Sequence, residues 1–366
     1  GCPPAVPTVC STRIWRRPLW VPGPDTPTSA TTSSLKTVGL LHGPLAESTR
    51  LSILRDMALI AVAFMLLAVV MPMHWLTDFA VFCILVLSFD LLYGYMGRLS
   101  FGHVLYYGVG MYAASLALVH LALNPFLAIG AGIFASAVLS SALGFIVVRT
   151  EGATFALVNL ALNQIGFWLA MSGLQAYTRG EDGLSSSVRA IGFLDFYKVP
   201  VAFGFMLVCL LLVFGLLRML TRSPFGILIR SIKENEERVK FLGYDTLRYK
   251  WLTFVIAATL AGFAGTLHAL VKGFVAPGDM GPLENARVIF AVLIGGAGNL
   301  YGAIVGGVVF ETMINLLATN IPRWEMFLGI MLLVLVFWFR RGITGYIADL
   351  ARKFSRSRGN PAERTP

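Results

Sequence analysis

The chain has few charges for its length and contains many apolar residues. Only 13% of its 366 residues are charged, whereas 57% are apolar; soluble proteins carry about 25% charged residues. A water-soluble core cannot hide so much apolar surface. Several apolar runs approach or exceed the roughly 20 residues that cross a bilayer as a helix. Lipid is therefore the expected solvent for most of the protein.

The sequence also lacks the common signatures of nucleotide binding and catalysis. It contains no G-x-x-x-x-G-K-[ST] phosphate-binding loop, no G-x-S-x-G and no H-E-x-x-H. The few cysteines and histidines show no spacing typical of metal ligands or of a structural disulfide. We therefore expect no enzyme activity, no metal site and no cofactor bound by this chain.

The pattern of apolar runs predicts an all-α integral membrane protein. The alternating ten-residue segments of a transmembrane β-barrel are absent, and in lipid a helix satisfies its own backbone hydrogen bonds. We expect a polytopic helical bundle of about 8–10 transmembrane segments. The predicted spans are 56–73, 77–96, 102–123, 125–148, 153–174, 199–220, 249–273, a broken pair at 287–318, and 324–339.

Composition divides the chain into three predicted parts. Residues 1–50 are rich in Pro, Ser and Thr without an apolar run, which is typical of a disordered tail. The first methionine is Met57, and a start assigned too far upstream would explain this tail. We expect a chain that starts near Met57 to insert and transport normally. Residues 51–345 form the predicted transmembrane domain, including a polar segment at 221–248, and residues 346–366 form a basic tail.

Lysine and arginine mark one side of the predicted bundle. They gather before the first span, after the second and fourth spans, in residues 218–250 and after Arg340. Counting crossings puts these groups on the same side, which the positive-inside rule identifies as the cytoplasm. We therefore expect both termini in the cytoplasm and the loop 175–198 on the opposite face. These loops and the tail account for the net charge of +10, so we expect no nucleic-acid partner.

Two glycine-rich stretches interrupt the apolar pattern. The run "RVIFAVLIGG" is too short to cross a bilayer at about 1.5 Å per residue, so we expect residues 287–318 to dip into the membrane and turn at 295–302. A related break lies at 94–103. The glycines expected to act as hinges or to allow close helix packing are Gly94, Gly97, Gly102, Gly295, Gly296, Gly298 and Gly302.

Polar side chains inside apolar spans are candidates for a translocation path, because burying them in a membrane is costly. Asn159 and Asn163 are one helical turn apart, and Glu311 and Asn315 repeat that spacing. The alternative is that such groups form hydrogen bonds between helices. The full candidate set is Asp90, Asn159, Asn163, Gln164, Glu311 and Asn315.

The segment "SIKENEERVKFLGYD", residues 231–245, is densely charged and lies between two spans. Helical spacing places Ile229, Ile232, Glu236, Val239 and Leu242 on one face, whose apolar members can pack on the bundle. Gly243 is a natural end for this helix. The segment is either a solvated loop or a docking helix for a cytoplasmic partner. The candidate coupling residues are Glu234, Asn235, Glu236, Glu237, Arg238 and Gly243.

Several of these stretches together resemble one family. "SPFGILIRSIKENEERVKFLGYD", "LLYGYMGRLSFGHVLYYGVGMYAA", "TFALVNLALNQI", "RGEDGL" and "LIGGAGNLYGAIVGG" resemble segments of the branched-chain amino acid ABC-transporter permeases of the Liv M type. The resemblance covers most of residues 77–345. The sequence departs from the family pattern at Asp90, Asn159 and Arg179. The departures at Asn159 and Arg179 bear on substrate choice, so urea, amides or aromatic acids remain alternatives to leucine, isoleucine and valine.

The resemblance implies a multi-pass permease in the bacterial plasma (inner) membrane. It implies that ABC ATPase subunits dock on residues 231–245 and carry ATP and Mg²⁺, and that a sister permease subunit and a periplasmic substrate-binding protein complete the importer. The alternative function is an ion-coupled secondary transporter or channel without an ATPase, for which Asp90 and Glu311 are suitable carboxylates.

Overall fold

The computed structural model describes residues 44–121, 124–186, 190–191, 194–196 and 198–320, together with positions 326, 329–330, 342–343 and 345. Contacts divide the chain into two units, residues 1–50 and 51–366. Of the first unit only residues 44–50 are described, and they form the start of a helix. The predicted basic tail and nearly all of the predicted span 324–339 lie outside the described residues.

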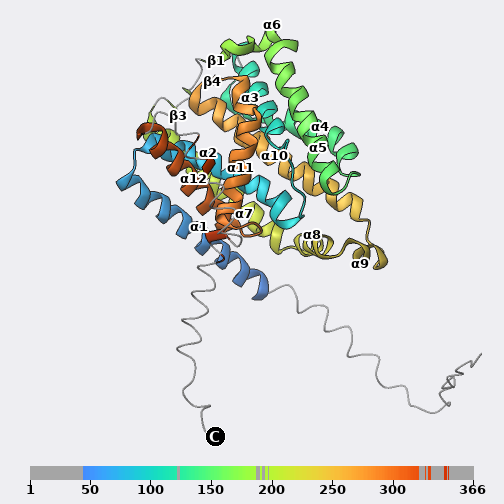
Figure 1. The fold of residues 1–366 in the computed structure, drawn as a ribbon. Helices are drawn as coiled ribbons and strands as arrows, with labels where there is room; N and C mark the ends of the chain where they lie inside the picture. Colours follow the sequence, from blue (N-terminus) through green and yellow to red (C-terminus); the bar gives the residue numbers. More distant parts are fainter. Residues whose placement is uncertain are drawn as a thin grey trace, which may run out of the picture. The chain divides into compact units, whose positions relative to one another are not determined.

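The described part of the chain is helical (Figure 1). The long helices are α1 (Pro44–Val70), α2 (Met73–Asp90, continued by a π-helical turn, Leu91–Tyr95), α3 (Val104–Val119), α4 (Pro125–Val147), α5 (Gly152–Trp168, continued by a π-helical turn, Leu169–Gly173), α7 (Val199–Arg222), α10 (Thr246–Lys272) and α12 (Leu300–Asn320). The shorter ones are α6 (Gln175–Thr178), α8 (Pro224–Glu234), α9 (Glu236–Phe241) and α11 (Pro282–Gly295).

Seven of the described helices are long and apolar enough to cross a membrane, and the 16-residue α3 is a shorter apolar helix. The prediction of an all-α polytopic membrane protein is therefore confirmed. The first helix begins at Pro44, ahead of the boundary expected at residue 50, and proline is favoured at the first position of a helix. Single-turn 3₁₀ helices lie at Gly180–Asp182 and Pro277–Met280.

Helix α2 lies at the centre of the bundle and packs against α7, α10, α11 and α12. Most of its surface is apolar, as expected for a helix surrounded by protein, and its two carboxylates are Asp78 and Asp90. Helix α10 packs against α3 and α4, and small residues let these backbones approach closely. A Cβ atom added at Gly110 would come 2.1 Å from the carbonyl oxygen of Gly262. Helices α4 and α5 leave many apolar side chains exposed, as expected for a surface in lipid.

The predicted break between the last two described helices is present. Helix α11 ends at Gly295 and α12 begins at Leu300, and the two pack against each other. With 14 residues, α11 is about 21 Å long, which is shorter than the roughly 30 Å hydrocarbon core of a bilayer. A Cβ at Gly295 would come 1.9 Å from the carbonyl oxygen of Gly302, so this glycine permits the close packing that the sequence predicts.

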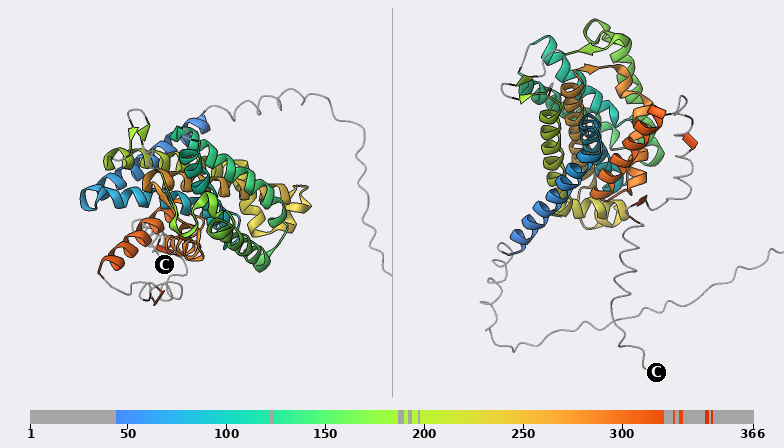
Figure 2. Two further views of the ribbon diagram at one scale, coloured as in Figure 1. Left: turned by 90° about the horizontal axis from the view of Figure 1, so that it is seen from above. Right: turned by 90° about the vertical axis from the view of Figure 1, so that its left-hand side faces the viewer.

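The two ends of the bundle differ in structure. Helices α8 and α9 lie together at one end, and β1 (Leu184–Ser185) and β4 (Phe274–Val275) form an antiparallel pair at the other (Figures 1 and 2). A second antiparallel pair, β2 (Ala190–Ile191) and β3 (Leu194–Asp195), lies in the same loop as β1. The loop predicted on the opposite face from residues 221–248 therefore does lie at the other end of the bundle.

Candidate functional site

Residues 223–241 form two short helices, whereas the sequence pattern predicts one continuous helix over this stretch. The Ser223 side chain accepts a hydrogen bond from the backbone N–H of Gly226 and begins α8, which ends at Glu234. Asn235 has an extended backbone, and its side chain accepts a hydrogen bond from the N–H of Arg238 over 2.9 Å, which begins α9. Asn is a favoured N-cap, and this cap breaks the predicted helix into two.

The break changes which side chains face the bundle. Ile229, Ile232 and Val239 are buried as predicted. Leu242 was expected on the same face, but it is 72% exposed, and the neighbouring Phe241 is 88% exposed. Leu242 follows the last residue of α9, so helical spacing no longer fixes its direction. Of the candidate coupling residues, Glu234, Glu237 and Arg238 are exposed, and Gly243 has a φ of 86°, where a glycine ends the segment without strain.

Glu236 points toward the bundle and joins several helices. It forms ion pairs with Lys250 of α10, with Lys240 over 3.1 Å and with Arg98 over 3.8 Å, and Thr246 donates a hydrogen bond to it over 3.1 Å. Burial raises the pKa of Glu236, but the hydrogen bonds from Lys250 and Lys240 outweigh it and lower the pKa to about 2. Glu236 therefore stays charged at neutral pH.

Arg98 extends this network into the membrane helices. It donates a hydrogen bond to the carbonyl oxygen of Thr150 and lies 3.7 Å from Glu151, just before α5. The lysine and arginine residues at 98, 149 and 218–250 thus lie at one end of the bundle, as the count of membrane crossings predicts. Glu236 was a candidate docking residue on sequence grounds, and its contacts give it the separate role of holding α9 to α5 and α10.

The coupling segment contacts one glycine-rich break directly, and Asp90 connects that break to the other. The ammonium of Lys233 donates to the carbonyl oxygen of Gly94 over 2.7 Å. One turn earlier, Asp90 accepts a hydrogen bond from the backbone N–H of Gly298, in the break between α11 and α12. A Cβ at Gly94 would come 2.1 Å from Oδ1 of Asp90. These contacts connect α8 to the end of α2, and the end of α2 to the turn between α11 and α12.

The amides predicted on the translocation path do not share one surface. Asn159 is buried and donates to the carbonyl oxygen of Phe155 in its own helix. Asn163 is buried and donates to the carbonyl oxygen of Met280 over 3.2 Å, whereas Gln164 is exposed. The close approach of Gly102 to the backbone of Asn159 agrees with its predicted packing role. Asn163 thus bonds to a distant segment, close to the alternative of hydrogen bonds between helices, whereas the bond of Asn159 stays within its own helix.

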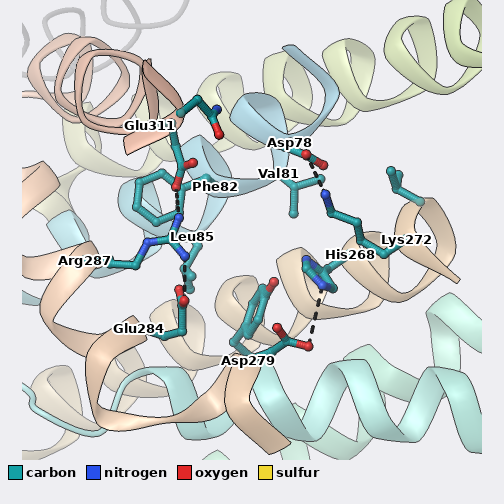
Figure 3. Close-up of a pocket in the computed structure, with 13 residues that line it drawn as sticks. Asp78, Val81, Phe82, Leu85, His268, Lys272, Asp279, Glu284, Arg287 and Glu311 are labelled. Carbon is teal, nitrogen blue, oxygen red and sulfur yellow. Dashed lines mark hydrogen bonds and ion pairs between the residues drawn. The ribbon is translucent and has the colours of Figure 1, made fainter. Parts of the chain in front are cut away.

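Glu311 and Asn315 line a pocket of about 280 Å³ at the end of the bundle opposite α8 and α9. Figure 3 shows this pocket, which we call the charged pocket. Its ionisable side chains come from α2, α10, α11, α12 and the 3₁₀ turn before α11. They are Asp78, His268, Lys272, Asp279, Glu284, Arg287 and Glu311. Asp90, Asn159 and Asn163 lie outside it.

The ionisable side chains of the pocket contact one another in three separate groups. Arg287 contacts Glu284 and Glu311, each over 2.5 Å, and so joins α11 to α12. Lys272 contacts Asp78 over 2.6 Å, and His268 lies 3.9 Å from Asp279 (Figure 3). Sequence reasoning found only Glu311 and Asn315 here. The other charged residues of the pocket lie where apolar runs of the sequence begin or end. That position was the signal that could have identified them.

Helices of membrane-crossing length, a polar segment tied to the bundle at one end and a charged pocket at the other are the features of a multi-pass membrane protein. Residues 71–337 match the family described as "Branched-chain amino acid transport system / permease component". The match covers well over half of the chain. The chain therefore belongs to this permease family.

Curated relatives agree with this assignment. The chain is 28% identical over 287 residues to the high-affinity branched-chain amino acid transport system permease protein LivM of Salmonella typhimurium, covering 72% of this chain and 67% of the relative. It is 28% identical over 323 residues to LivM of Escherichia coli, covering 78% and 74%. It is 26% identical over 317 residues to the probable LivM of Methanocaldococcus jannaschii, covering 72% and 90%. No solved structure matches the chain.

Proposed function

We propose that the chain is the membrane-spanning subunit of an ABC importer for branched-chain or related amino acids, driven by ATPase subunits that dock on residues 231–245. One observation carries the docking role. The outer face of this segment presents exposed charged and apolar side chains, whereas its inner face is fastened to the bundle through Glu236 and Lys233. A segment through which a separate ATPase moves the membrane helices needs an exposed face for docking and an opposite face that is fixed to the bundle.

The exposed side of the segment is suited to a protein partner. Phe241 and Leu242 precede α10, outside the apolar spans, and are mostly exposed. Exposed apolar groups in water, surrounded by charged ones, are typical of protein–protein interfaces. The nearby Glu234, Glu237 and Arg238 supply charges that can select the partner.

The contacts of Lys233 and Glu236 with the bundle can transmit a movement of the coupling segment to the membrane helices. A displacement of α8 acts on the carbonyl oxygen of Gly94 through Lys233, and a displacement of α9 acts on α5 and α10 through Glu236. Glycine-rich breaks are places where helices change direction at low cost. ATP and Mg²⁺ bind to the ATPase in this scheme, and the permease receives only the mechanical change.

The remaining partners are a sister permease subunit and a periplasmic substrate-binding protein. The chain is similar both to LivM and, at 24% identity over 247 residues, to LivH of Escherichia coli, two differently named permeases of one organism. This supports pairing with a related but different subunit. On the positive-inside rule we assign the coupling end to the bacterial cytoplasm, and we expect both chain termini on the same side of the membrane.

The substrate class follows from the names of the relatives, which are branched-chain amino acid permeases. The ion-coupled alternative has no support among the relatives. The two carboxylates that suggested it are engaged, Asp90 with the backbone of Gly298 and Glu311 with Arg287.

The test is to isolate the chain from its own cells through an affinity tag and to identify what copurifies. We expect an ATPase subunit in the preparation and ATP-dependent uptake of leucine, isoleucine or valine after reconstitution with the binding protein. Urea, amides and aromatic acids serve as the comparison panel. Uptake that proceeds without any ATPase and follows an ion gradient would overturn the proposal.

A further inference from the structure

We propose that the charged pocket binds an α-amino acid as a zwitterion. In this arrangement Lys272 takes the ligand carboxylate, Asp78 and Asp279 take its ammonium, and Val81, Phe82 and Leu85 contact its aliphatic side chain. The choice of an amino acid as ligand rests on the transport function proposed above. The assignment of the site rests on the side chains that line the pocket.

The charge content of the pocket favours a ligand that carries an ammonium group. Its lining holds four carboxylates, those of Asp78, Asp279, Glu284 and Glu311, against the two permanent cations of Lys272 and Arg287. An added cation lowers this imbalance, and an added lone anion increases it. A zwitterion also supplies a carboxylate, which replaces that of Asp78 beside Lys272 when a ligand separates the two side chains. An amine without a carboxylate lacks that compensation.

The ion pairs of the pocket differ in how readily they can open. The Lys272 and Asp78 side chains are 46% and 33% exposed, and such pairs contribute only about 0–1 kcal/mol. Arg287 and Glu311 are 23% and 8% exposed, and breaking a buried pair leaves a costly unpaired charge. The ligand therefore inserts between Lys272 and Asp78, while Arg287 keeps its two carboxylates and holds α11 against α12.

One wall of the same pocket is apolar. Val81, Phe82 and Leu85 come from α2, and Val271 comes from α10. The first three are buried and packed, so their positions are fixed before a ligand arrives. A cavity of about 280 Å³ is slightly smaller than the roughly 300–1,000 Å³ typical of ligand sites, which suits a single amino acid rather than a peptide. An aliphatic side chain gains from contact with this wall, and urea does not.

The location of the pocket agrees with entry from the side opposite the ATPase. Lys250, which pairs with Glu236, and Lys272 lie on the same helix, 22 residues apart and so separated by about 33 Å. With the coupling segment in the cytoplasm, the charged pocket faces the compartment from which an importer takes its substrate. The Arg287 contacts then connect this pocket to the hairpin whose turn Asp90 holds.

The experiment measures equilibrium binding of radiolabelled leucine to the assembled transporter in lipid nanodiscs, without the periplasmic binding protein. Competitors separate the chemical groups: 3-methylbutylamine lacks the carboxylate of leucine, and 4-methylpentanoate lacks its ammonium. Lys272→Met is compared with the charge-preserving Lys272→Arg. Val271→Phe narrows the apolar side of the pocket without touching any charge, and glycine serves as a small ligand for that variant.

We expect leucine to bind, and both single-charge analogues to compete at least about tenfold more weakly, which corresponds to about 1.4 kcal/mol. Lys272→Met should weaken leucine binding by a similar factor, and Lys272→Arg should retain most of it. Val271→Phe should weaken leucine more than glycine. Unchanged leucine affinity in Lys272→Met and Val271→Phe, or competition by 3-methylbutylamine equal to that of leucine, would overturn the assignment.

ATPase copurification and ATP turnover are measured on the same preparations. Retained ATPase subunits with no leucine binding in the unaltered transporter would reject the pocket while leaving the proposed function intact. Absence of the ATPase from every preparation would reject the proposed function. Because Lys272→Met removes one member of an ion pair, its thermal stability is recorded, and Val271→Phe provides a test that does not depend on that pair.

Discussion

The backbone N–H of Gly298 donates a hydrogen bond to Oδ1 of Asp90, 2.7 Å away. This contact joins the end of α2 to the turn between α11 and α12, two parts of the chain that are 208 residues apart. Asp90 was a candidate for the translocation path because it is a carboxylate inside an apolar span. Its observed partner gives it a positioning role at the place where both helices are interrupted.

Asp90→Asn should preserve this contact, because the amide oxygen of asparagine accepts the same hydrogen bond. Asp90→Ala should cost about 1–3 kcal/mol, since it leaves a buried N–H without a partner. Thermal unfolding of the purified transporter measures the difference. Equal unfolding temperatures for the alanine and asparagine variants would contradict the positioning role.

Gly94→Ala should disturb the same junction. The added Cβ would come 2.1 Å from Oδ1 of Asp90 and 2.3 Å from the backbone N of Gly298, so it must separate the two groups. Gly204→Ala is the matched control, because a Cβ at Gly204 meets nothing within 4 Å. We expect lower thermal stability and uptake for Gly94→Ala only. Similar behaviour of both variants would show that the close approach at Gly94 has no consequence.

The contribution of Glu236 should depend on pH in a defined window. Its pKa in the folded protein is about 2, below the ordinary value of 4.5, so its ion pairs stabilise the fold above about pH 4.5. This stabilisation is lost as the pH falls toward 2. Glu236→Gln should therefore lower thermal stability by a constant amount between pH 8 and 5, and the difference should shrink below about pH 4.5. A difference that already disappears between pH 8 and 6 would contradict this.

The long helices could be predicted because a run of about 20 apolar residues has few other stable states in lipid. The break at Asn235 could not. A continuous amphipathic helix and two capped helices share the same apolar spacing, and only the side-chain hydrogen bond of Asn235 decides between them. The pattern placed Leu242 inward for that reason.

The rest of the site depends on contacts between residues that are far apart in the sequence. The inward direction of Glu236 depends on Arg98 and Lys250, and nothing local in the sequence connects these residues. The pair of Lys272 and Asp78 spans 194 residues, so the charged pocket was visible in the sequence only through Glu311 and Asn315. The short length of "RVIFAVLIGG", in contrast, was sufficient to predict the break at Gly295.

The start of α1 allows a sharper test of the N-terminal region. Arg218 contacts the buried Asp56 over 3.2 Å, and Arg222 donates a hydrogen bond to Ser52. A chain that begins at Leu51 keeps both contacts and should transport normally. One that begins at Met57 loses both and should have lower thermal stability, contrary to the expectation from the sequence. Equal stability of the two truncated chains would show that these contacts contribute little.

Cysteine labelling tests the orientation in the membrane. Ser185 lies exposed in β1, at the end near the charged pocket, and Glu237 lies exposed in the coupling segment. With Cys2 and Cys10 replaced by serine, an impermeant reagent should label Ser185→Cys in intact cells and Glu237→Cys only after permeabilisation. The described native cysteines are buried, which keeps the background low. The reverse pattern of labelling would invert the topology.

The central claim is that residues 231–245 dock an ATPase, and charge reversal tests it most directly. Glu234 and Glu237 are exposed, and no ion pair is observed for either among the described residues. Changing both to lysine should alter stability by less than about 0.5 kcal/mol, whereas losing charged contacts at an interface costs about 2–5 kcal/mol. Glu181→Lys, exposed at the opposite end, is the control.

The measurement is ATPase copurification with the Glu234→Lys, Glu237→Lys double variant, recorded beside its thermal stability and ATP-driven uptake. The account predicts loss of the ATPase and of uptake at unchanged thermal stability, and full retention of both in Glu181→Lys. Normal copurification and uptake in the double variant, or a loss of uptake matched by an equal loss of stability, would contradict it.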